Sequence, residues 1–205
     1  KNPLHYLSRE LSFLAFNERV LAQARDASLP LLERLRFLTI SCTNLDEFFE
    51  IRVAGLSQQI HYNLTKRGSD GRTPAETLAA VGEQAHRFVA EQYRVLNEEL
   101  MPAMERQGLA VRKRGEWTPA QARWIVEFFE REVLPVLTPL GLDPAHPFPR
   151  ILNKSLNFAI ELEGKDAFGR SSNAAIVQAP RVLPRVIQLP EALAGCAYGF
   201  VFLSS

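Results

Sequence analysis

Four small polar residues in a row, Ser41 to Asn44, interrupt an otherwise apolar helical segment, and they could take part in chemistry (SCTNLDEFFEIR, residues 41–52). Asn44 is followed three residues later by Glu47, which matches a helix N-cap with its reciprocal glutamate and predicts that a new helix starts at Asn44. A helix N-terminus also presents free backbone N–H groups and the positive end of the helix dipole, so a ligand can approach there. The two interpretations are compatible, and Asn44 is both a predicted cap and a candidate ligand contact.

The other residues that could act in catalysis or bind a metal form no recognisable motif in the sequence. The four histidines are widely scattered, and none lies at the spacing of metal ligands (His5, His61, His86 and His146). There is no glycine-rich loop of the kind that cradles phosphates. Acidic residues mostly fall on polar helix faces, and His146 lies in a proline-rich stretch where a packed loop residue is expected. The residues by themselves indicate no catalytic or metal-binding site.

Composition narrows the class of protein. The 205 residues are 46% hydrophobic and 23% charged, as in a typical globular protein, and the net charge of +1 argues against nucleic acid or an anionic membrane as partner. Cys42 and Cys196 form no disulfide framework, which favours a reducing, cytoplasmic setting. No apolar run reaches the roughly 18 residues of a membrane span, and the N-terminus lacks a signal-peptide core. The chain lacks an initial Met and ends within an apolar run, so we expect a fragment of a longer protein.

Apolar residues at helical spacing predict helices over most of the first hundred residues. The first helix has Ser8 as its expected N-cap and an apolar stripe of Leu7, Leu11, Leu14 and Leu21, widened by Phe13, Phe16 and Val20. A second begins near Pro30 and a third at Asn44. Thr73 and Glu76 form a capping-box pattern at the start of a long helix that is expected to end at Gly108. Long antiparallel helices joined by short turns predict a bundle-like domain over residues 1–107.

Residues 108–205 have a different pattern. One more helix begins at Thr118 and is expected to bury Trp124, Ile125, Phe128, Phe129 and Val133. Dense prolines between Pro135 and Pro149 exclude a regular helix there. Short apolar runs, most of them bounded by proline or glycine, predict strands (155–162, 173–180, 184–190 and 198–205). The predicted fold class is α+β: an antiparallel helical bundle, then a truncated α+β domain with a mainly antiparallel sheet.

Three long blocks of sequence follow one another in order: SRELSFLAFNERVLAQA (8–24), PLLERLRFLTISCTNLDEFFEIRVAGL (30–56) and PVLTPLGLDPAHPFPRILNKSLNFAI (135–160). Together they resemble the N-terminal and head domains of the long-form bacterial polyphosphate kinase family. The resemblance extends over essentially the whole chain. Phe13 stands where tryptophan is commoner in that family, and a swap between large aromatic residues in a buried stripe leaves the assignment unchanged.

The resemblance implies a four-domain enzyme that reversibly moves the terminal phosphate of ATP onto polyphosphate through a phosphohistidine. It implies that ATP lies in a tunnel and that Asn44, in the N-L-D-E-F block, contacts it on the adenine side. An amide suits adenine because it donates and accepts at once, and a net hydrogen bond of roughly 0.5–1.5 kcal/mol orients the base more than it adds affinity. The family's catalytic histidines and its residues for Mg²⁺ and phosphate lie beyond residue 205. None of the four histidines here matches them.

The resemblance also implies ADP and polyphosphate as ligands, the enzyme's own C-terminal catalytic domains as partners, and a homodimer formed through the head domain, without nucleic acid. We expect a cytoplasmic location, with association at the periphery of the inner membrane left open, and no kinase activity of the 205 residues alone. The alternative is a non-enzymatic helical interaction module. Its groove would be lined by Phe13, Phe16, Phe48 and Phe49, although such residues at helical spacing more often belong to the core.

Overall fold

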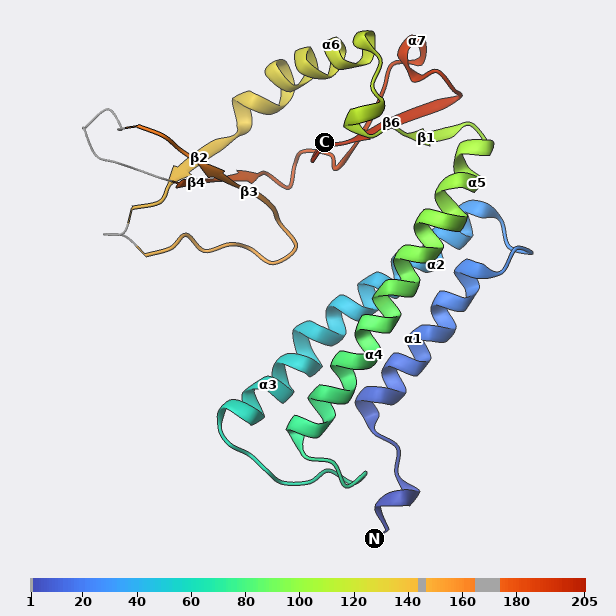
Figure 1. The fold of residues 1–205 in the computed structure, drawn as a ribbon, viewed down its shortest axis with the longest axis vertical. Helices are drawn as coiled ribbons and strands as arrows, with labels where there is room; N and C mark the ends of the chain where they lie inside the picture. Colours follow the sequence, from blue (N-terminus) through green and yellow to red (C-terminus); the bar gives the residue numbers. More distant parts are fainter. Residues whose placement is uncertain (1, 144–146, 165–173) are drawn as a thin grey trace. The chain divides into compact units, whose positions relative to one another are not determined.

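The structure is a computed structural model that describes residues 2–143, 147–164 and 174–205. The chain forms two compact units, Lys1–Gln107 and Gly108–Ser205. The elements described in the first, the helical unit, are all helices, whereas the second, the head unit, combines helices with short strands (Figure 1). His146, expected as a packed loop residue, lies outside the described residues. Within the described ranges, no helix is both long and apolar enough to cross a membrane.

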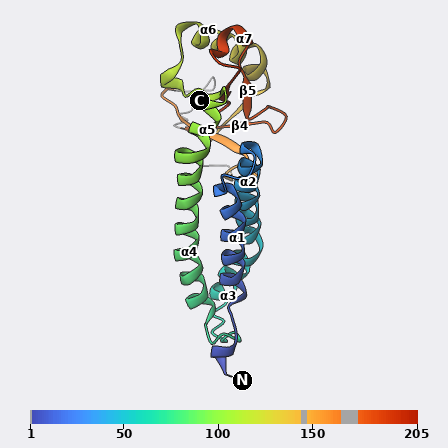
Figure 2. The same cartoon turned by 90° about the vertical axis from the view of Figure 1, so that its right-hand side faces the viewer.

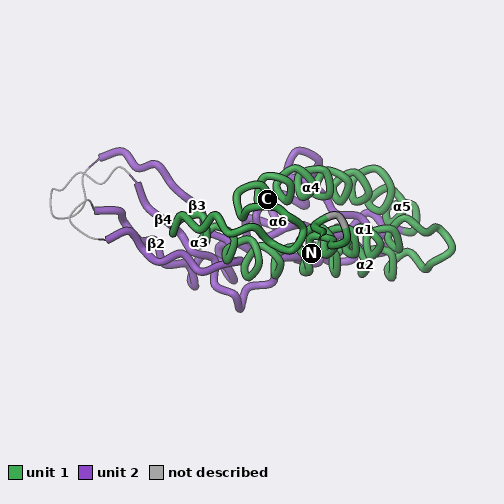
Figure 3. The backbone as a smooth tube through the Cα atoms, turned by 90° about the horizontal axis from the view of Figure 1, so that it is seen from below, with its two compact units in different colours: residues 1–107 green, residues 108–205 purple. Residues whose placement is uncertain are grey.

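Three long helical rods make up the helical unit, and rods that follow one another along the chain run antiparallel (Figure 2; residues 1–107 are green in Figure 3). The first rod is α1; the second joins α2, a π-helical segment and α3 without leaving helical backbone geometry; the third joins α4, another π-helical segment and α5. Their bounds are, in order, a 3₁₀ turn (Pro3–His5), α1 (Arg9–Arg25), α2 (Leu31–Phe48), the π-helical segment Phe49–Val53, α3 (Ala54–His61), α4 (Pro74–Arg94), the π-helical segment Val95–Leu100, and α5 (Met101–Arg106).

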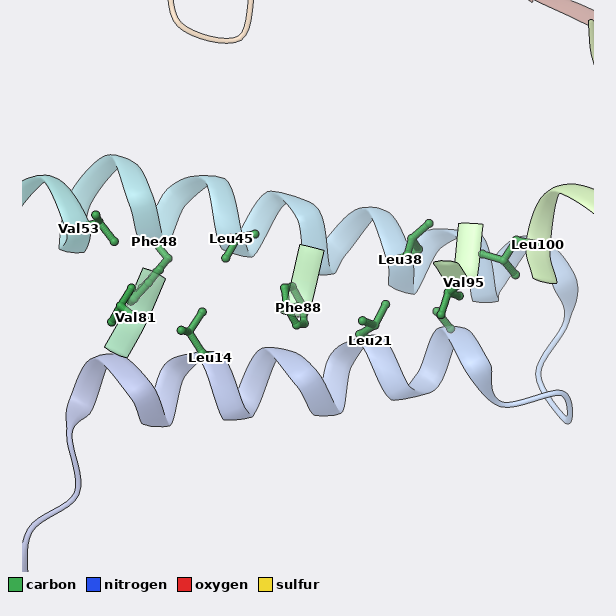
Figure 4. Close-up of a cluster of buried hydrophobic side chains, with 11 residues drawn as sticks. Leu14, Leu21, Leu38, Leu45, Phe48, Val53, Val81, Phe88, Val95 and Leu100 are labelled. Carbon is green, nitrogen blue, oxygen red and sulfur yellow. The ribbon is translucent and has the colours of Figure 1, made fainter. Parts of the chain in front are cut away.

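The core of the helical unit is formed by apolar residues that recur at seven-residue steps. Figure 4 shows Leu14 and Leu21 of α1 opposite Leu38 and Leu45 of α2. The third rod adds Val81, Phe88 and Val95 to the same buried cluster. A seven-residue apolar repeat keeps one stripe of a long helix facing its neighbours over its whole length. The pattern in the sequence therefore accounts for the lengthwise packing of the rods.

The capping residues predicted for two helix starts are confirmed. Ser8 Oγ accepts a hydrogen bond from the backbone N–H of Leu11 at 3.4 Å, at the start of α1. At the start of α4, Thr73 Oγ1 accepts from the N–H of Glu76 at 3.2 Å, and Glu76 Oε2 accepts from the N–H of Thr73 at 2.7 Å. Gly108 follows the third rod with φ +80°, a backbone conformation that favours glycine.

Some expected core positions of the helical unit are wrong. Leu7 is 88% exposed, because it precedes the cap Ser8 and does not lie on the helix. Phe16 and Phe49 are exposed, whereas Phe48 is buried and stacks on Phe13 with ring centroids 5.0 Å apart. The four phenylalanines are thus divided between core and surface and do not line one groove.

Charged side chains link the three rods near the turn between α1 and α2. Arg34 donates to Glu99 at 3.1 Å, and Glu99 also accepts from Arg94 at 2.9 Å. Arg94 donates two further hydrogen bonds to the carboxylate of Glu91, both 2.8 Å long. Glu91 in turn pairs with Arg25 at 3.4 Å. Because these residues come from α1, α2 and the third rod, the network connects all three.

Glu91 gives this network a pH dependence. Hydrogen bonds from Arg94 lower the pKa of Glu91 below its ordinary value of 4.5; burial opposes this effect, and the charges of Arg94 and Arg25 add to it. A carboxyl group whose pKa is lowered by folding stabilises the folded state fully above its unfolded pKa, and that stabilisation is lost as the pH falls through the folded pKa. We therefore expect Glu91→Gln to lower the thermal midpoint at about pH 7 and to differ less from the wild type at about pH 3.

Thermal unfolding followed by circular dichroism at both pH values measures this difference. If Glu91→Gln lowered the thermal midpoint equally at both pH values, the assignment would be contradicted. The stabilisation by the Glu91 carboxylate would then not depend on its ionisation.

The head unit contains short strands between short helices. Their bounds are, in order, β1 (Leu109–Val111), a 3₁₀ turn (Arg114–Glu116), α6 (Pro119–Phe128), a π-helical segment (Phe129–Val133), a 3₁₀ turn (Leu134–Val136), β2 (Thr138–Gly141), β3 (Leu156–Glu161), β4 (Ala174–Ala179), β5 (Val186–Gln188), α7 (Glu191–Ala194) and β6 (Tyr198–Phe202).

These strands form two three-stranded sheets, in the orders β1-β6-β5 and β2-β4-β3. β4 pairs antiparallel with β2 and with β3, and β6 pairs antiparallel with β5 and parallel with β1. Helices followed by small, mainly antiparallel sheets confirm the predicted α+β class. The sequence did not predict β1 or β2, since both are short and β2 contains Pro139. Proline is tolerated there because β2 is at the edge of its sheet, where a missing N–H donor costs no ladder hydrogen bond.

The core of the head unit is small and includes both tryptophans. Ile187, Leu189 and Val201 are buried, and packed against them lie Trp117, Trp124, Ile125, Phe128 and Leu203. Val133 is buried as predicted, but Phe129 is exposed. Phe129 is the first residue of the π-helical segment that follows the regular helix α6.

Candidate functional site

A cleft of about 530 Å³ opens in the helical unit between α1 and the second rod. Its lining combines charged, polar and aromatic side chains: Arg9, Glu10, Ser12 and Phe13 from α1, Asn44, Glu47 and Phe48 from α2, and Ile51 and Arg52 from the π-helical segment that follows. Asn44, predicted from the sequence as the ligand contact, belongs to this lining. The structure therefore places Asn44 in a concave site shared by two rods.

Asn44 does not cap a helix, and this prediction is wrong. α2 continues from Leu31 to Phe48, so Asn44 lies inside it. The hydroxyl of Ser41 donates to the carbonyl of Leu38 at 2.7 Å, and the hydroxyl of Thr43 donates to a carbonyl one turn earlier, so these side chains are satisfied without ending the helix. Leu38 and Leu45 keep the apolar stripe in phase across the polar run. Packing of that stripe outweighs the local preference of asparagine for a cap.

Three buried polar side chains, one from each rod, form a hydrogen-bond network in the interior next to Asn44. Asn17 of α1 and Ser41 of α2 are completely buried, and Gln92 of α4 nearly so. Asn17 Nδ2 donates to the backbone carbonyl of Ser41 at 2.8 Å. Gln92 Nε2 donates to Ser41 Oγ at 2.8 Å and to Cys42 Sγ at 3.3 Å. A buried amide costs free energy unless it is hydrogen-bonded, and here each has a partner.

Asn44 connects this network to the cleft. Its Nδ2 donates to Asn17 Oδ1 at 3.1 Å. Its own Oδ1 accepts no hydrogen bond from any residue that the structure describes, and the side chain is half-buried in the lining of the cleft. One amide group thus has its nitrogen tied to the protein interior and its oxygen left available to accept a hydrogen bond from a ligand.

The remaining lining suits a flat ring with polar edges. Phe13 lies in the lining and is supported by its stack on buried Phe48. Aromatic faces contact flat rings favourably, and an amide beside them can fix a ring by its edge. Two arginines and two glutamates line the cleft, so its formal charge is balanced. A balanced lining gives no strong attraction for a polyanion, and contacts to phosphate groups must come from other residues.

The thiol and the histidines offer no catalytic chemistry near the cleft. Partial burial, followed by the nearby carboxylate of Asp46, raises the pKa of the Cys42 thiol from its ordinary 9.0, so it stays protonated at neutral pH and is a poor nucleophile. His5, His61 and His86 are exposed and do not line the cleft. In the part of the chain that the structure describes, no group of three His, Cys, Asp or Glu side chains is arranged to hold a metal ion.

Asn17 is the residue beside the candidate site that sequence reasoning missed. It lies three residues after Leu14 and four before Leu21, so it occupies the apolar stripe of α1. An amide on a core-facing stripe is a detectable signal, because a buried polar group needs a specific partner. The sequence alone does not show that this partner is Asn44, on another rod.

Comparison of the sequence with known protein families identifies the class to which this chain belongs. Residues 6–112 match the family described as "Polyphosphate kinase N-terminal domain", and residues 120–205 match the family described as "Polyphosphate kinase middle domain". The chain belongs to the polyphosphate kinase family.

Individual relatives agree with this assignment. The polyphosphate kinase of Neisseria meningitidis is 57% identical over 199 residues, which cover 97% of this chain and 29% of that protein. The polyphosphate kinase of Burkholderia multivorans is 56% identical over the same length and with the same coverage. The crystal structure of polyphosphate kinase from Porphyromonas gingivalis superposes with a TM-score of 0.78 at 28% identity, covering 97% of this chain and 28% of that one. The chain therefore spans about 29% of the length of the curated relatives it matches.

Proposed function

We propose that this chain is part of a polyphosphate kinase that reversibly transfers the terminal phosphate of ATP to polyphosphate through a phosphohistidine. Its helical unit covers the adenine side of the ATP site. Membership of the family supports the proposed reaction. The cleft beside Asn44 supports the proposed position of the adenine base. The proposal includes a cytoplasmic homodimer formed through the head unit, with ADP and polyphosphate as the other ligands.

The observation that carries this proposal is that Asn44 Oδ1, in the lining of the cleft, accepts no hydrogen bond from the described residues. The edge of adenine carries an exocyclic amine, which donates, next to ring nitrogens, which accept. The oxygen of Asn44 accepts from the amine, and its second N–H remains to donate to a ring nitrogen. Phe13 supplies an aromatic surface for the purine ring.

The residues of this chain orient the base, and they do not perform phosphoryl transfer. That reaction needs a nucleophile aligned with the terminal phosphate and cations that stabilise the developing charge. The balanced charge of the cleft and the positions of His5, His61 and His86 supply neither. In our proposal the catalytic histidine, the Mg²⁺ ligands and the phosphate-binding arginines belong to the C-terminal domains of the enzyme. The 205 residues alone are then inactive.

Asn44→Ala in the full-length kinase carrying this sequence tests the proposed contact. We expect KM for ATP to rise by roughly fivefold to tenfold, because the hydrogen bonds from the Asn44 amide to the base are lost, and the preference for ATP over GTP to weaken. Steady-state kinetics with both nucleotides measure these changes. The thermal midpoint should also fall, because the buried Oδ1 of Asn17 loses the hydrogen bond that Asn44 donates to it.

Thr43→Ala is the matched control, because Thr43 is the exposed neighbour of Asn44 and hydrogen-bonds within its own helix. It should leave the kinetics with both nucleotides unchanged. If Asn44→Ala lowered only the thermal midpoint and kept the nucleotide kinetics, Asn44 would act in packing and the proposed contact would be refuted.

A further inference from the structure

We propose that Asn17 is a positioning residue for nucleotide choice: it fixes the orientation of the Asn44 amide so that the cleft presents an acceptor, which selects purines with an amine at carbon 6 over purines with a ketone there. This inference rests on the proposed function, since it assumes that a nucleobase meets Asn44.

The first step concerns the orientation of Asn17. Its amide is completely buried, so reversing it would leave buried polar atoms without partners. Asn17 Nδ2 lies 2.8 Å from the backbone carbonyl of Ser41, which can accept but never donate. The nitrogen of Asn17 must therefore face Ser41, and its oxygen must face the other way.

The second step transfers this orientation to Asn44. The oxygen of Asn17 can only accept, and it lies 3.1 Å from the Asn44 side chain. Only the nitrogen of Asn44 can donate to it. A reversed Asn44 amide would place two oxygens against each other in a half-buried position, losing one hydrogen bond and adding repulsion. The backbone of α2 thus determines, through Asn17, which atom Asn44 presents.

The third step is the consequence for a bound base. An amide that is free to rotate adapts to either a donor or an acceptor on the base, and so discriminates poorly. An amide held with its oxygen outward pairs with a 6-amino group and opposes a 6-keto group. Sites that hydrogen-bond a specific group reject analogues in which that group is missing or reversed, because polar atoms of the site are left unpaired.

The test uses the full-length kinase with three nucleotides: ATP, inosine triphosphate with a 6-keto group, and purine riboside triphosphate with neither group. For the wild type we expect kcat/KM to fall about tenfold when the amine is removed and further when it is replaced by the ketone. Asn17→Leu keeps the approximate shape of the side chain and removes both hydrogen bonds. It should reduce the ATP-to-ITP ratio of kcat/KM by about tenfold, largely through better use of ITP.

Two further variants separate positioning from stability. Gln92→Met removes another buried amide from the same network, but Gln92 hydrogen-bonds neither Asn17 nor Asn44. It should lower the thermal midpoint and keep the ATP-to-ITP ratio. The double variant Asn17→Leu/Asn44→Ala should have the same ratio as Asn44→Ala alone, because Asn17 acts only through Asn44.

The outcomes distinguish the inference from the function on which it rests. If Asn44→Ala weakens the preference for ATP while Asn17→Leu keeps it, the positioning role is overturned and the proposed contact stands. If Asn44→Ala leaves nucleotide kinetics unchanged, both are overturned. Should Asn17→Leu fail to fold, Asn17→Ser serves in its place. Equal kcat/KM values of the wild type for ATP and ITP would also overturn the inference.

Discussion

Replacing Leu14 with alanine is expected to lower the free energy of unfolding of the helical unit by about 3–4 kcal/mol. Leu14 is completely buried and belongs to the core cluster that all three rods contribute to (Figure 4). Truncation removes apolar contacts and leaves a cavity. The rods cannot move together to close it, because the other buried residues of the seven-residue repeats hold them apart.

Leu32→Ala is the control for this prediction, because it makes the same chemical change at a position of α2 that is 56% exposed. It should change the free energy of unfolding by less than about 0.5 kcal/mol. Urea unfolding followed by circular dichroism measures both variants. Tryptophan fluorescence reports the head unit separately, since Trp117 and Trp124 both lie there. Equal effects of the two substitutions on the helical signal would refute the assigned core.

Arg34→Met is expected to destabilise the helical unit by about 2 kcal/mol. The Arg34 side chain is 13% exposed, and it makes two contacts with other rods. Nε donates to the carbonyl of Ala24, in the last turn of α1, at 2.8 Å, and Nη2 donates to Glu99 at 3.1 Å. Methionine keeps most of the aliphatic stem, so the measured loss comes from the hydrogen bonds that the Ala24 carbonyl and the Glu99 carboxylate no longer receive from Arg34.

The exposed neighbour Arg36 provides the comparison. Its side chain is 70% exposed and lies 3.7 Å from Glu33 on the same helix. An exposed pair of this kind contributes little, so Arg36→Met should cost less than about 0.5 kcal/mol. Adding salt should also weaken the Arg36 contact more than the contacts of Arg34, since solvent-exposed pairs are screened more strongly. If both variants had the same stability as the wild type, the network around Arg34 would not hold the rods together.

The head unit was the harder part to predict. β3, β4, β5 and β6 fall within apolar runs that the sequence marked, but β1 and β2 do not stand out because they are short. β1 is a strand only because it pairs with β6, which lies at the far end of the unit. A three-residue segment has no periodicity of its own, and a distant partner determines its structure.

In the candidate site, the sequence selected Asn44 but gave it the wrong structural role. The pattern of Asn44 and Glu47 is that of a cap, and capping preferences are worth only about 1 kcal/mol. Burial of Leu38, Leu45 and Phe48 along one continuous stripe outweighs that preference. The helix therefore runs through Asn44, and the side chain faces the cleft and Asn17.

Features that depend on residues within a turn or two can be predicted from the sequence: the apolar repeats of the rods, the cap at Ser8, and the capping box of Thr73 and Glu76. The blocks that resemble a known family are also visible there. Tertiary structure alone decided that α2 continues through Asn44, that Asn17 meets Asn44, and that β1 joins β6. The two groups of features differ in the distance along the chain over which the interactions that determine them act. Caps and periodicity are set by neighbours in the chain, whereas a hydrogen bond between two rods exists only once apolar packing has brought them together.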